Sequence, residues 1–315
     1  MNNSTLATPI ESSNPSGGNP PHGISVLNRT DWLEQRKRGI GGSDAAAAVG
    51  LSPYKTPHQL YLEKRGEVEP EDISDKEAVI WGNNLEDVVA QEFARRTGRK
   101  VARVNSMLVH PDYPFMLASI DRRVVGERTG LEVKTAGQWA ASSEQWGPSG
   151  SDEVPPQYLV QAQHYLSVSG YDRWDLAVLI GGQDFRIYTI MRDEALISKL
   201  VELEAAFWRD VQNGTPPQFT TTDEVRALFP KSIPKAIEAD DDLAGTIQEA
   251  QQMKGEIKAA TSRLEALKAI ICGYMEDHDT LTYLGTTLAT WKSGERKGYT
   301  VEPTTTRTLL LKDVK

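Results

Sequence analysis

The sequence has 315 residues, 39% of them hydrophobic and 25% charged, so it can form a sizeable core without disulfide bonds. Lysine and arginine number 35 against 44 acidic residues, and the net charge of −9 argues against binding nucleic acid through overall charge while leaving room for a local basic groove. The one cysteine, Cys272, excludes an internal disulfide framework, a cysteine-cluster zinc site and a four-cysteine iron–sulfur site.

The first part of the chain, residues 1–22, is rich in Asn, Ser, Pro and Gly, and we expect a disordered tail there. It has no basic stretch followed by an apolar one, so it does not resemble a secretory signal. No apolar run along the chain approaches the ~20 residues that span a membrane. Together with the single cysteine, these patterns predict a cytoplasmic protein.

Short helices and a glycine turn come next. Residues 28–38 are predicted to form a short helix. The segment GIGGSDAAAAVG is then predicted to form a glycine turn that leads into an alanine-rich helix, with Ser43 or Asp44 as the N-cap. The following helix, in TPHQLYLEKRG, has a threonine cap, a proline at its first position and a glycine at its end. An acidic loop is expected over residues 67–77.

The middle of the chain alternates between helices and strands. A long helix over residues 77–97 has hydrophobic side chains at helical spacing and ends at Gly98. Further helices are predicted from residue 155 onward and over residues 193–212. The strand candidates are residues 100–109, 115–119, 121–125, 130–135, 175–180 and 184–190, with a hairpin turn at GERTG. This order predicts an α+β or mixed α/β fold.

A Pro- and Thr-rich stretch over residues 214–235 marks a boundary. Beyond it, residues 241–278 are predicted to be helical, with two rows at heptad spacing that suit a coiled-coil-like packing seam. One row is Leu243, Ala250, Ile257, Leu264 and Ile271, and the other is Thr246, Met253, Ala260, Leu267 and Tyr274. An amphipathic helix that lies on its own domain is an equal alternative. Residues 280–292 are predicted to form a hairpin, and a basic tail follows.

The segment ASIDRRVVGERTGLEVKT carries two carboxylates and a lysine. Asp121 stands at the start of one predicted strand, and Glu132 and Lys134 lie two residues apart on the next, so their side chains share a face that the hairpin can bring beside Asp121. Two carboxylates supply the oxygen ligands of a hard cation such as Mg²⁺, which polarises a phosphate. A lysine beside the attacking water stabilises developing charge. The set therefore indicates phosphodiester cleavage.

A surface salt bridge between Glu132 and Lys134 is the alternative interpretation, because an acid-x-Lys triplet is common. The chain has three more triplets, beginning at Glu256, Glu295 and Asp313, and none of them follows a strand-borne aspartate across a hairpin. Because Asp121 stands on the preceding strand, this segment supports phosphodiester cleavage and a surface salt bridge equally.

The glycine turn is a second candidate site. Gly41 and Gly42 expose backbone amides, and Ser43 opens a helix whose free N–H groups can bind an anion. Arg36 can make a bidentate contact with a phosphate. A plain helix cap is the alternative, and it is compatible with a phosphate site.

Four motifs in chain order resemble the YqaJ-like viral recombinases, the phage lambda exonuclease type of the PD-(D/E)xK nucleases. They are RKRGIGGSDAA, WGNNLEDVVAQEF, SIDRRV followed by LEVKT, and PPQYLVQAQHYL. The resemblance implies a restriction-endonuclease-like core in which helices flank a central mixed sheet. We therefore expect the tail over residues 1–22, a nuclease domain over residues 23–220, and an extension over residues 221–315 with a long amphipathic helix and a β-hairpin.

The resemblance also implies which residues bind metal. Asp121, Glu132 and the Val133 backbone carbonyl would be ligands, and Lys134 would act on the attacking water. The implied cofactor is Mg²⁺, with two ions per active site and Mn²⁺ as a substitute.

Two helices would contribute further groups to the same centre. By resemblance, Glu86 would complete the metal or water site, although an acid on a solvated helix face is its alternative. Gln161 would orient groups at the active centre, with Tyr158 one helical turn before it. Plain packing or solvent contact is the alternative for this helix face.

For the substrate, the resemblance implies linear double-stranded DNA whose 5′-terminal phosphate is held by Arg36, Ser43 and Ser119. The enzyme would digest the 5′-ended strand in the 5′-to-3′ direction and leave 3′ single strands for homologous recombination. The implied partners are a single-strand annealing recombinase and further copies of the chain in a homotrimeric ring. A phage or prophage protein in a bacterial cell is the implied setting.

Two other functions are left open by the residues. An endonuclease of restriction or junction-cutting type would share the core, and it would cut closed circular DNA, which an exonuclease leaves intact. A catalytically inactive DNA-binding scaffold would carry the same carboxylates and Lys134 as ordinary surface groups. A zinc- or nucleophile-based enzyme is disfavoured, because the five histidines are scattered and no serine or cysteine motif stands beside them.

Charge is distributed unevenly along the chain. Residues 63–92 and 193–256 each have a net charge of −7, so we expect that DNA does not lie along residues 63–77 or 193–256. Residues 292–315 carry +3. Between residues 95 and 103 the chain has five basic residues and no acid, a net charge of +5 that fits either a DNA channel or a solvated face. These residues are Arg95, Arg96, Arg99, Lys100 and Arg103.

Overall fold

The computed structural model describes residues 21–25, 29–138, 145–232 and 234–293. Its contacts divide the chain into two units, Met1–Glu224 and Val225–Lys315. Most of the expected disordered tail, residues 1–20, lies outside the described residues, as does the basic tail over residues 294–315. His22 is the exception, because it begins the strand β1 (His22–Ser25) instead of belonging to a tail.

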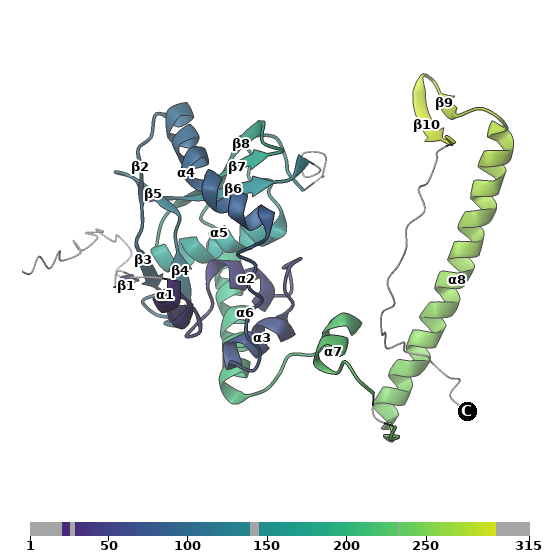
Figure 1. The fold of residues 1–315 in the computed structure, drawn as a ribbon, viewed down its shortest axis with the longest axis horizontal. Coiled ribbons are helices and arrows are strands. Elements are labelled where there is room, and N and C mark those ends of the chain that lie inside the picture. The colour runs from purple at the N-terminus through teal and green to yellow at the C-terminus, as the bar shows by residue number, and fades with distance from the viewer. Residues whose placement is uncertain (1–20, 26–28, 139–144, 233, 294–315) are drawn as a thin grey trace, which may run out of the picture. The chain divides into compact units, whose positions relative to one another are not determined.

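A five-stranded sheet forms the centre of the first unit, with the strand order β2-β5-β6-β7-β8 (Figure 1). Its strands are β2 (Val101–Arg103), β5 (Arg122–Val124), β6 (Thr129–Ala136), β7 (Arg173–Ile180) and β8 (Asp184–Met191). β6 and β7 run parallel, and the other neighbours run antiparallel. A parallel pair needs a crossover, which contains α5 (Pro156–Ser169). The strand with the Glu-x-Lys motif is therefore in the middle of a mixed sheet.

A second sheet has three strands in the order β1-β3-β4, with β3 (Ser106–Val109) and β4 (Leu117–Ser119). The prediction of a single strand over residues 100–109 is wrong, because β2 and β3 occupy this segment and belong to different sheets. Alternation of side chains determines which face a residue takes, but it does not determine which sheet the strand joins.

Two helices cover the two faces of the five-stranded sheet (Figure 1). On one face α4 (Glu77–Thr97) packs Phe93 in a cluster with Leu131. On the other, α5 packs Leu166 in a cluster with Leu176. Because successive residues of a strand point to opposite faces, Leu131 faces α4 and Glu132 faces α5.

Further helices hold the glycine turn. α1 (Arg29–Arg36) precedes it, and an apolar cluster joins α5 to α2 (Gly42–Ala48), α3 (Pro57–Arg65) and α6 (Glu194–Asn213).

The predicted ends of α3 and α4 are confirmed, since Gly66 and Gly98 close them with φ of 69° and 71°. The predicted N-cap of α2 at Ser43 or Asp44 is wrong. Gly41 is the N-cap, and Asp44 accepts the Gly41 N–H at 3.3 Å from the third helical position.

The second unit contains the 35-residue helix α8 (Asp241–Met275) and a hairpin of β9 (Thr280–Tyr283) and β10 (Thr286–Thr290), as the sequence predicts. The Asp240 carboxylate caps α8 by accepting the Leu243 N–H at 2.8 Å. Within α8, which is described in full, Met275 is the one buried side chain. A short helix, α7 (Thr222–Leu228), is not predicted from the sequence.

The basic run from Arg95 to Arg103 begins in the last turn of α4 and ends on β2, and it is paired with acidic side chains. Arg95 and Arg96 both contact Glu92 at 2.7 Å, and Arg103 contacts Asp87 at 3.0 Å. Three of the run's five cations therefore pair with carboxylates of α4, which supports the solvated-face alternative over a DNA channel.

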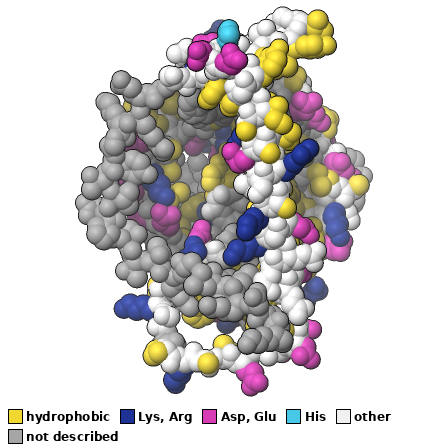
Figure 2. Space-filling view, turned by 90° about the vertical axis from the view of Figure 1, so that its right-hand side faces the viewer, with side chains coloured by type: hydrophobic (Ala, Val, Ile, Leu, Met, Phe, Trp, Pro, Cys, Tyr) yellow, Lys and Arg dark blue, Asp and Glu magenta, His cyan; other side chains and the backbone are white. Residues whose placement is uncertain are grey.

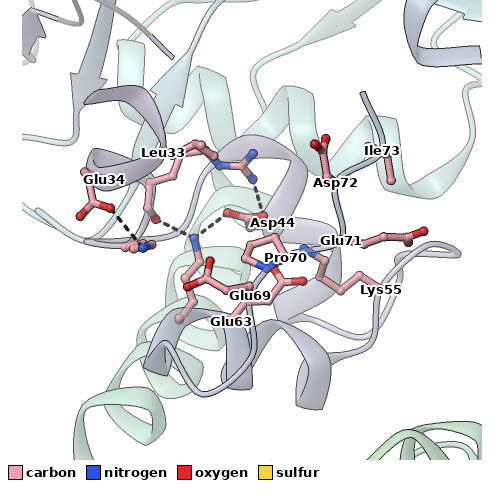
Figure 3. Close-up of a pocket in the computed structure, with 13 residues that line it drawn as sticks. Leu33, Glu34, Asp44, Lys55, Glu63, Glu69, Pro70, Glu71, Asp72 and Ile73 are labelled. Carbon is pink, nitrogen blue, oxygen red and sulfur yellow. Dashed lines mark hydrogen bonds and ion pairs between the residues drawn. The ribbon is translucent and has the colours of Figure 1, made fainter. Parts of the chain in front are cut away.

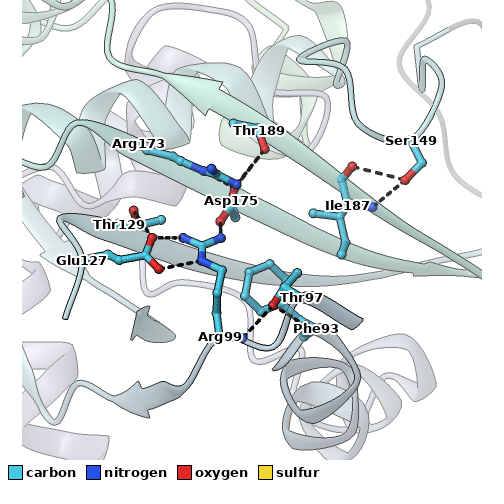
Figure 4. Close-up of polar contacts among 10 residues, drawn as sticks. All are labelled: Phe93, Thr97, Arg99, Glu127, Thr129, Ser149, Arg173, Asp175, Ile187 and Thr189. Atoms are coloured by element: carbon cyan, nitrogen blue, oxygen red, sulfur yellow. Dashed lines mark hydrogen bonds and ion pairs between the residues drawn. The ribbon is translucent and has the colours of Figure 1, made fainter. Parts of the chain in front are cut away.

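Arg99, from the same run, belongs to a buried polar cluster (Figure 4). Its guanidinium contacts the fully buried carboxylate of Asp175 and also Glu127 at 2.6 Å. Arg173 Nε and the Thr189 hydroxyl donate to the other Asp175 oxygen at 2.8 Å and 3.0 Å. This cluster ties the end of α4 to β7 and β8, so Arg99 stabilises the sheet.

The arrangement confirms the predicted class, an α+β protein in which helices flank a central mixed sheet. None of the helices in the described ranges is both long and apolar enough to cross a membrane. Every residue predicted for the active site or the phosphate site lies in the first unit.

Candidate active site

Strand β6 and the residue just before its neighbour β5 bring the predicted metal ligands together. Glu132 and Lys134 share a face of β6, and the Lys134 ammonium contacts Glu132 Oε1 at 2.6 Å. Asp121 lies immediately before β5, the antiparallel neighbour of β6, and its carboxylate accepts the Val133 N–H at 3.0 Å. The hairpin therefore places two carboxylates and an ammonium at one point of the sheet.

The surroundings of Asp121 change its titration. Burial, and then the charge of Glu132, raises the pKa of Asp121 to about 8. Burial would lower the pKa of Lys134, but Glu132 and Asp121 outweigh it, and the pKa lies above its ordinary value. The ammonium is thus cationic at neutral pH, and it partly neutralises the carboxylate pair.

One oxygen of Glu132 has no partner among the described side chains and backbone. Oε2 is buried without a hydrogen bond, whereas Oε1 accepts from both Lys134 and Gln161. A buried carboxylate oxygen without a donor is costly, and a divalent cation beside Glu132 and Asp121 would satisfy it and favour ionisation of both carboxylates. The donor set therefore fits a hard cation.

The protein would supply only part of a cation's coordination shell. In the described ranges no group of three or more His, Cys, Asp or Glu side chains is arranged to hold a metal ion. A hard cation such as Mg²⁺ usually keeps several waters and binds through one or two carboxylates together with substrate phosphates. Two carboxylates are therefore compatible with Mg²⁺.

Helix α5 contributes two of the predicted residues to this centre. Gln161 is buried, and its Nε2 donates to Glu132 Oε1 at 2.9 Å and to the Tyr165 hydroxyl at 3.2 Å. The Tyr158 ring centroid lies 5.1 Å from Lys134 Nζ. The structure thus places both residues beside the carboxylates, and their parts in catalysis stay predictions.

Glu86, on α4, contacts a different group. Its Oε1 lies 2.6 Å from Arg122 Nη1, and Asp87 lies 2.7 Å from the other terminal nitrogen. Arg122 is buried, so the two acids neutralise a cation that would be costly alone. The charge of Glu86 nevertheless contributes to the raised pKa of Asp121. Glu86 is therefore close to the centre but is not joined to it by a direct contact, and its metal role stays a prediction.

A small pocket of about 40 Å³ collects the residues predicted to bind phosphate. Arg36 Nη2 donates to the Ser43 hydroxyl at 3.1 Å, and Trp32 Nε1 donates to the Ser119 hydroxyl at 3.0 Å. The lining residues are Trp32, Arg36, Gly41, Gly42, Ser43, Met107, Leu117, Ser119 and Tyr165. Segments from α1, the glycine turn and β4 therefore converge on one pocket.

Tyr165 connects this pocket to the carboxylates, because its ring lines the pocket and its hydroxyl accepts from Gln161. The close approach of α2 to α5 requires glycine at position 42, where a Cβ would lie 2.3 Å from the Tyr165 ring. The glycine turn therefore has a packing function. Its Gly41 N–H is not free for an anion as the sequence suggests, because it donates to Asp44, and Gly42 is buried.

Asp44 holds Arg36 in place at the pocket. Its carboxylate is buried and accepts from Arg36 Nη2 at 2.6 Å and from Lys64 Nζ at 2.8 Å (Figure 3). Burial would raise the pKa of Asp44, but Arg36 and Lys64 outweigh it and hold the pKa well below its usual range. The Arg36 guanidinium also lies 4.7 Å from the centroid of the Trp32 ring. These contacts hold the guanidinium in one orientation.

A larger pocket of about 440 Å³ shares Arg36 and Asp44 with this network (Figure 3). Lysines 37, 55 and 64 line it, together with residues 69–73, which include three acids. Those acids belong to the segment 63–77, along which we expect no DNA.

Several residues that hold the site in place are missed by sequence reasoning. Asp44 is identified only as a helix cap, and Lys64, Trp32 and Tyr165 are not identified as contributors. Asp44 had a partial signal, since an acid three residues after the N-cap is typical of a capping box. Lys64 had none, because its contact with Asp44 joins two helices.

Comparisons with known proteins find one family. Residues 31–172 match the YqaJ-like viral recombinase domain. The chain is also 38% identical, over 276 residues, to the uncharacterized protein YqaJ of Bacillus subtilis (strain 168), an alignment that covers 85% of this chain and 84% of that relative.

Some solved structures are distantly similar. An alkaline exonuclease (LHK-Exo) from Laribacter hongkongensis gives a TM-score of 0.49 at 18% identity, covering 64% of this chain and 100% of that one. The same protein in complex with dAMP gives 0.49 at 19% identity, covering 64% and 98%. A phage-related exonuclease from Haemophilus somnus 129PT gives 0.43 at 14% identity, covering 56% and 94%. Nothing about the chemistry of this chain follows from these distant similarities.

Proposed function

Since the chain belongs to the YqaJ-like viral recombinase family, we propose that it is a Mg²⁺-dependent 5′-to-3′ exonuclease on linear double-stranded DNA. It would leave 3′ single strands for recombination by an annealing protein. A homotrimeric ring around the DNA is part of the same proposal and is supported by the family resemblance alone.

The observation that carries the proposal is the arrangement of Asp121, Glu132 and Lys134. Two carboxylates converge from neighbouring strands, one of them with a buried oxygen that lacks a partner, and a cationic lysine contacts the other oxygen. A surface salt bridge does not account for this geometry, because Glu132 is only 5% exposed. Buried carboxylates that crowd one another in this way are concentrated at functional sites.

The residues of the site can each be given a task. Asp121 and Glu132, with the Val133 carbonyl, would hold Mg²⁺ or Mn²⁺ ions, which supply Lewis acidity toward the phosphate. Lys134 can hold a water by hydrogen bonding and stabilise negative charge that develops on the phosphate. Gln161 fixes Oε1 of Glu132 through its 2.9 Å hydrogen bond, which leaves Oε2 for the cation.

The phosphate pocket supports action at a DNA end. Arg36, Ser43 and Ser119 offer a guanidinium and two hydroxyls in a pocket of about 40 Å³. A terminal phosphate has one ester link and can enter such a pocket, whereas an internal phosphate is tethered on both sides. Since the pocket joins the carboxylates through Tyr165 and Gln161, an end held there would lie near the cleavage site.

The direct test compares the wild type with Lys134→Ala on linear duplex DNA in Mg²⁺. We expect strand-wise degradation by the wild type and a loss of rate of about 10²- to 10³-fold in the variant, the size typical of removing one group that stabilises the transition state. Lys199→Ala is the matched control, because Lys199 is exposed and contacts only Glu202 on α6. A wild type that degrades nothing would overturn the proposal, as would full activity of Lys134→Ala.

Covalently closed circular DNA separates the exonuclease from an endonuclease with the same core. We expect the circle to survive conditions that digest the linear form. Cutting of the circle would favour the endonuclease, and absence of both Mg²⁺ binding and cleavage would favour an inactive scaffold.

A further inference from the structure

Helix α8 presents a long row of exposed hydrophobic side chains, some of which are visible in Figure 2. Leu243, Ile257, Leu264 and Tyr274 are 51%, 65%, 51% and 79% exposed. A helix gains most of its stability from packing an apolar face, and an exposed apolar patch of this kind marks an interaction surface. This row has no part in the proposed nuclease site.

The row combines the two heptad-spaced sets of the sequence analysis and runs from Leu243 to Tyr274. Position a is the set that begins at Leu243, and position d is the set that begins at Thr246. Four and a half heptads are enough to define a coiled-coil seam. The row is uneven in size, since it contains Ala250 and Ala260 among larger residues. Side-chain size can therefore indicate how a partner helix is oriented.

Antiparallel pairing with a second α8 matches large residues to small ones. When the two helices overlap along their full length, each residue at position a meets a residue at position d of the other helix. Leu243 meets Tyr274, and the residue numbers of every such pair add up to 517. Ala250 then faces Leu267 of the second copy, and Ala260 faces Ile257. Parallel pairing would instead place each alanine against itself and leave space in two layers.

The flanking charges favour the same arrangement. In the antiparallel pair, position g of one helix lies beside position g of the other, and Glu256 faces Arg263 twice, once on each side of the symmetry axis. Parallel pairing sets Arg263 against Lys268, and this repulsion offsets its attractive contact of Glu249 with Lys254.

Antiparallel registers shifted by one heptad are worse. A shift in one direction sets Glu256 against itself and Lys254 against itself, which offsets its contact of Glu249 with Arg263. A shift in the other direction sets Arg263 against itself and Lys254 against Lys268. Among these arrangements the full overlap is the one without a like-charge contact.

We propose that α8 is a dimerisation element, which pairs with α8 of a second copy of this chain as a full-overlap antiparallel coiled coil. The pair is self-complementary, as a two-fold symmetric interface must be. It joins two chains through their second units and uses no residue of the first unit.

Disulfide crosslinking in the full-length chain tests the orientation. In a Cys272→Ser background, one protein carries Ala250→Cys and another carries Leu267→Cys. The two are mixed, oxidised and separated on a non-reducing gel. We expect a covalent dimer from the mixture and little from either protein alone. Gln248→Cys mixed with Ala269→Cys is the matched control, because these residues lie at the same level on the outer face of the pair and should not crosslink.

Crosslinking of Ala250→Cys with itself would overturn the proposal in favour of a parallel bundle. Absence of crosslinking in every mixture would also overturn it, and would show that residues 294–315, the first unit or another protein covers the row.

A charge exchange provides a second, independent measurement. Glu256→Arg sets arginine against Arg263, and we expect dimer formation through α8 to weaken about three- to tenfold. The double variant Glu256→Arg with Arg263→Glu restores opposite charges and should recover the wild-type dissociation constant in analytical ultracentrifugation. Equal dissociation constants for all three proteins would contradict the pairing.

Discussion

At the scale of single residues, Arg36 is ordered before any phosphate arrives. The Asp44 carboxylate at 2.6 Å, the Ser43 hydroxyl at 3.1 Å and the Trp32 ring at 4.7 Å hold its guanidinium. Ordering a free arginine side chain on binding costs about 1.5–2 kcal/mol of conformational entropy. Because the protein orders Arg36 during folding, this cost does not reduce the affinity for a terminal phosphate.

Arg36→Ala should remove the preference for 5′-phosphorylated DNA ends. Hydrogen bonds to charged groups contribute about 1.5–3 kcal/mol, which corresponds to a loss of roughly tenfold to a hundredfold in the ratio of rates on 5′-phosphate and 5′-hydroxyl duplexes. We expect the fold to survive, because Lys64 at 2.8 Å still neutralises Asp44. The ratio is measured from initial rates on the two linear duplexes.

Lys37→Ala is the control for this change, since Lys37 follows Arg36 in the chain but is exposed and contacts Glu34. An unchanged preference in Arg36→Ala would remove Arg36 from phosphate recognition and leave it with a packing function only.

The sequence indicates which residues carry chemistry better than it indicates what holds them. Asp121, Glu132 and Lys134 are predicted to converge because strand alternation and a hairpin are local rules. The contacts of Arg122 with Glu86 and of Lys64 with Asp44 are not predicted, because each joins two elements whose packing is set by the tertiary fold. For Glu86 this matters directly, since the residue implied as a metal ligand contacts a buried arginine.

At the scale of elements, a buried ion pair joins α5 to α6 and to β4. His164 and Glu204 are both fully buried, and His164 Nδ1 lies 2.9 Å from Glu204 Oε1 while Nε2 lies 2.9 Å from the Leu117 carbonyl. Both partners are acceptors, so both ring nitrogens donate and the ring is an imidazolium. Burial would lower the pKa of His164, but Glu204 and the carbonyl outweigh it, and the pKa is raised.

This pair should make part of the stability dependent on pH. The folded-state pKa of His164 lies above the unfolded value of about 6.5, so the contribution is complete below that pH and is lost as pH rises through the folded pKa. Glu204→Gln leaves a buried cation without its partner, and we expect a loss of about 3–5 kcal/mol in unfolding free energy at pH 6. The loss should shrink at pH 9 when unfolding is measured with denaturant.

Glu202→Gln is the matched control, because Glu202 lies on the same helix and is exposed. A Glu204→Gln loss that is the same at both pH values would contradict the assignment of an imidazolium, and would leave the pair as a neutral hydrogen bond.

Helices are predicted better than strand partners for a physical reason. α3 and α4 end at Gly66 and Gly98 as predicted, because a glycine with positive φ stops a helix locally. The division of residues 100–109 between two sheets has no such local signal. α7 is also missed, since seven residues within a Pro- and Thr-rich stretch show too little periodicity to reveal a helix.

At the scale of the whole molecule, net charge alone is a poor guide to DNA binding. By composition the run from Arg95 to Arg103 fits either a DNA channel or a solvated face, and in the structure Arg99 lies in a buried cluster while three of its neighbours contact acids. The cation proposed to bind a phosphate is instead Arg36, which lines the small pocket. The proposed phosphate binding would then depend on local geometry more than on summed charge.

The division into two units predicts that the nuclease site does not need α8. All residues of the four apolar clusters lie between Ile24 and Val211, and the site residues lie between Arg36 and Gln161. A chain that ends at residue 230 retains α7 and the 2.7 Å contact of His58 with the Pro217 carbonyl. We expect this chain to show the same thermal unfolding midpoint for the first unit and the same initial rate per site on linear duplex DNA.

The same truncation carrying Lys134→Ala should be inactive, which controls for a contaminating nuclease. An unfolded or inactive truncated chain would show that the second unit completes the site, and would contradict the division of labour inferred from the two units.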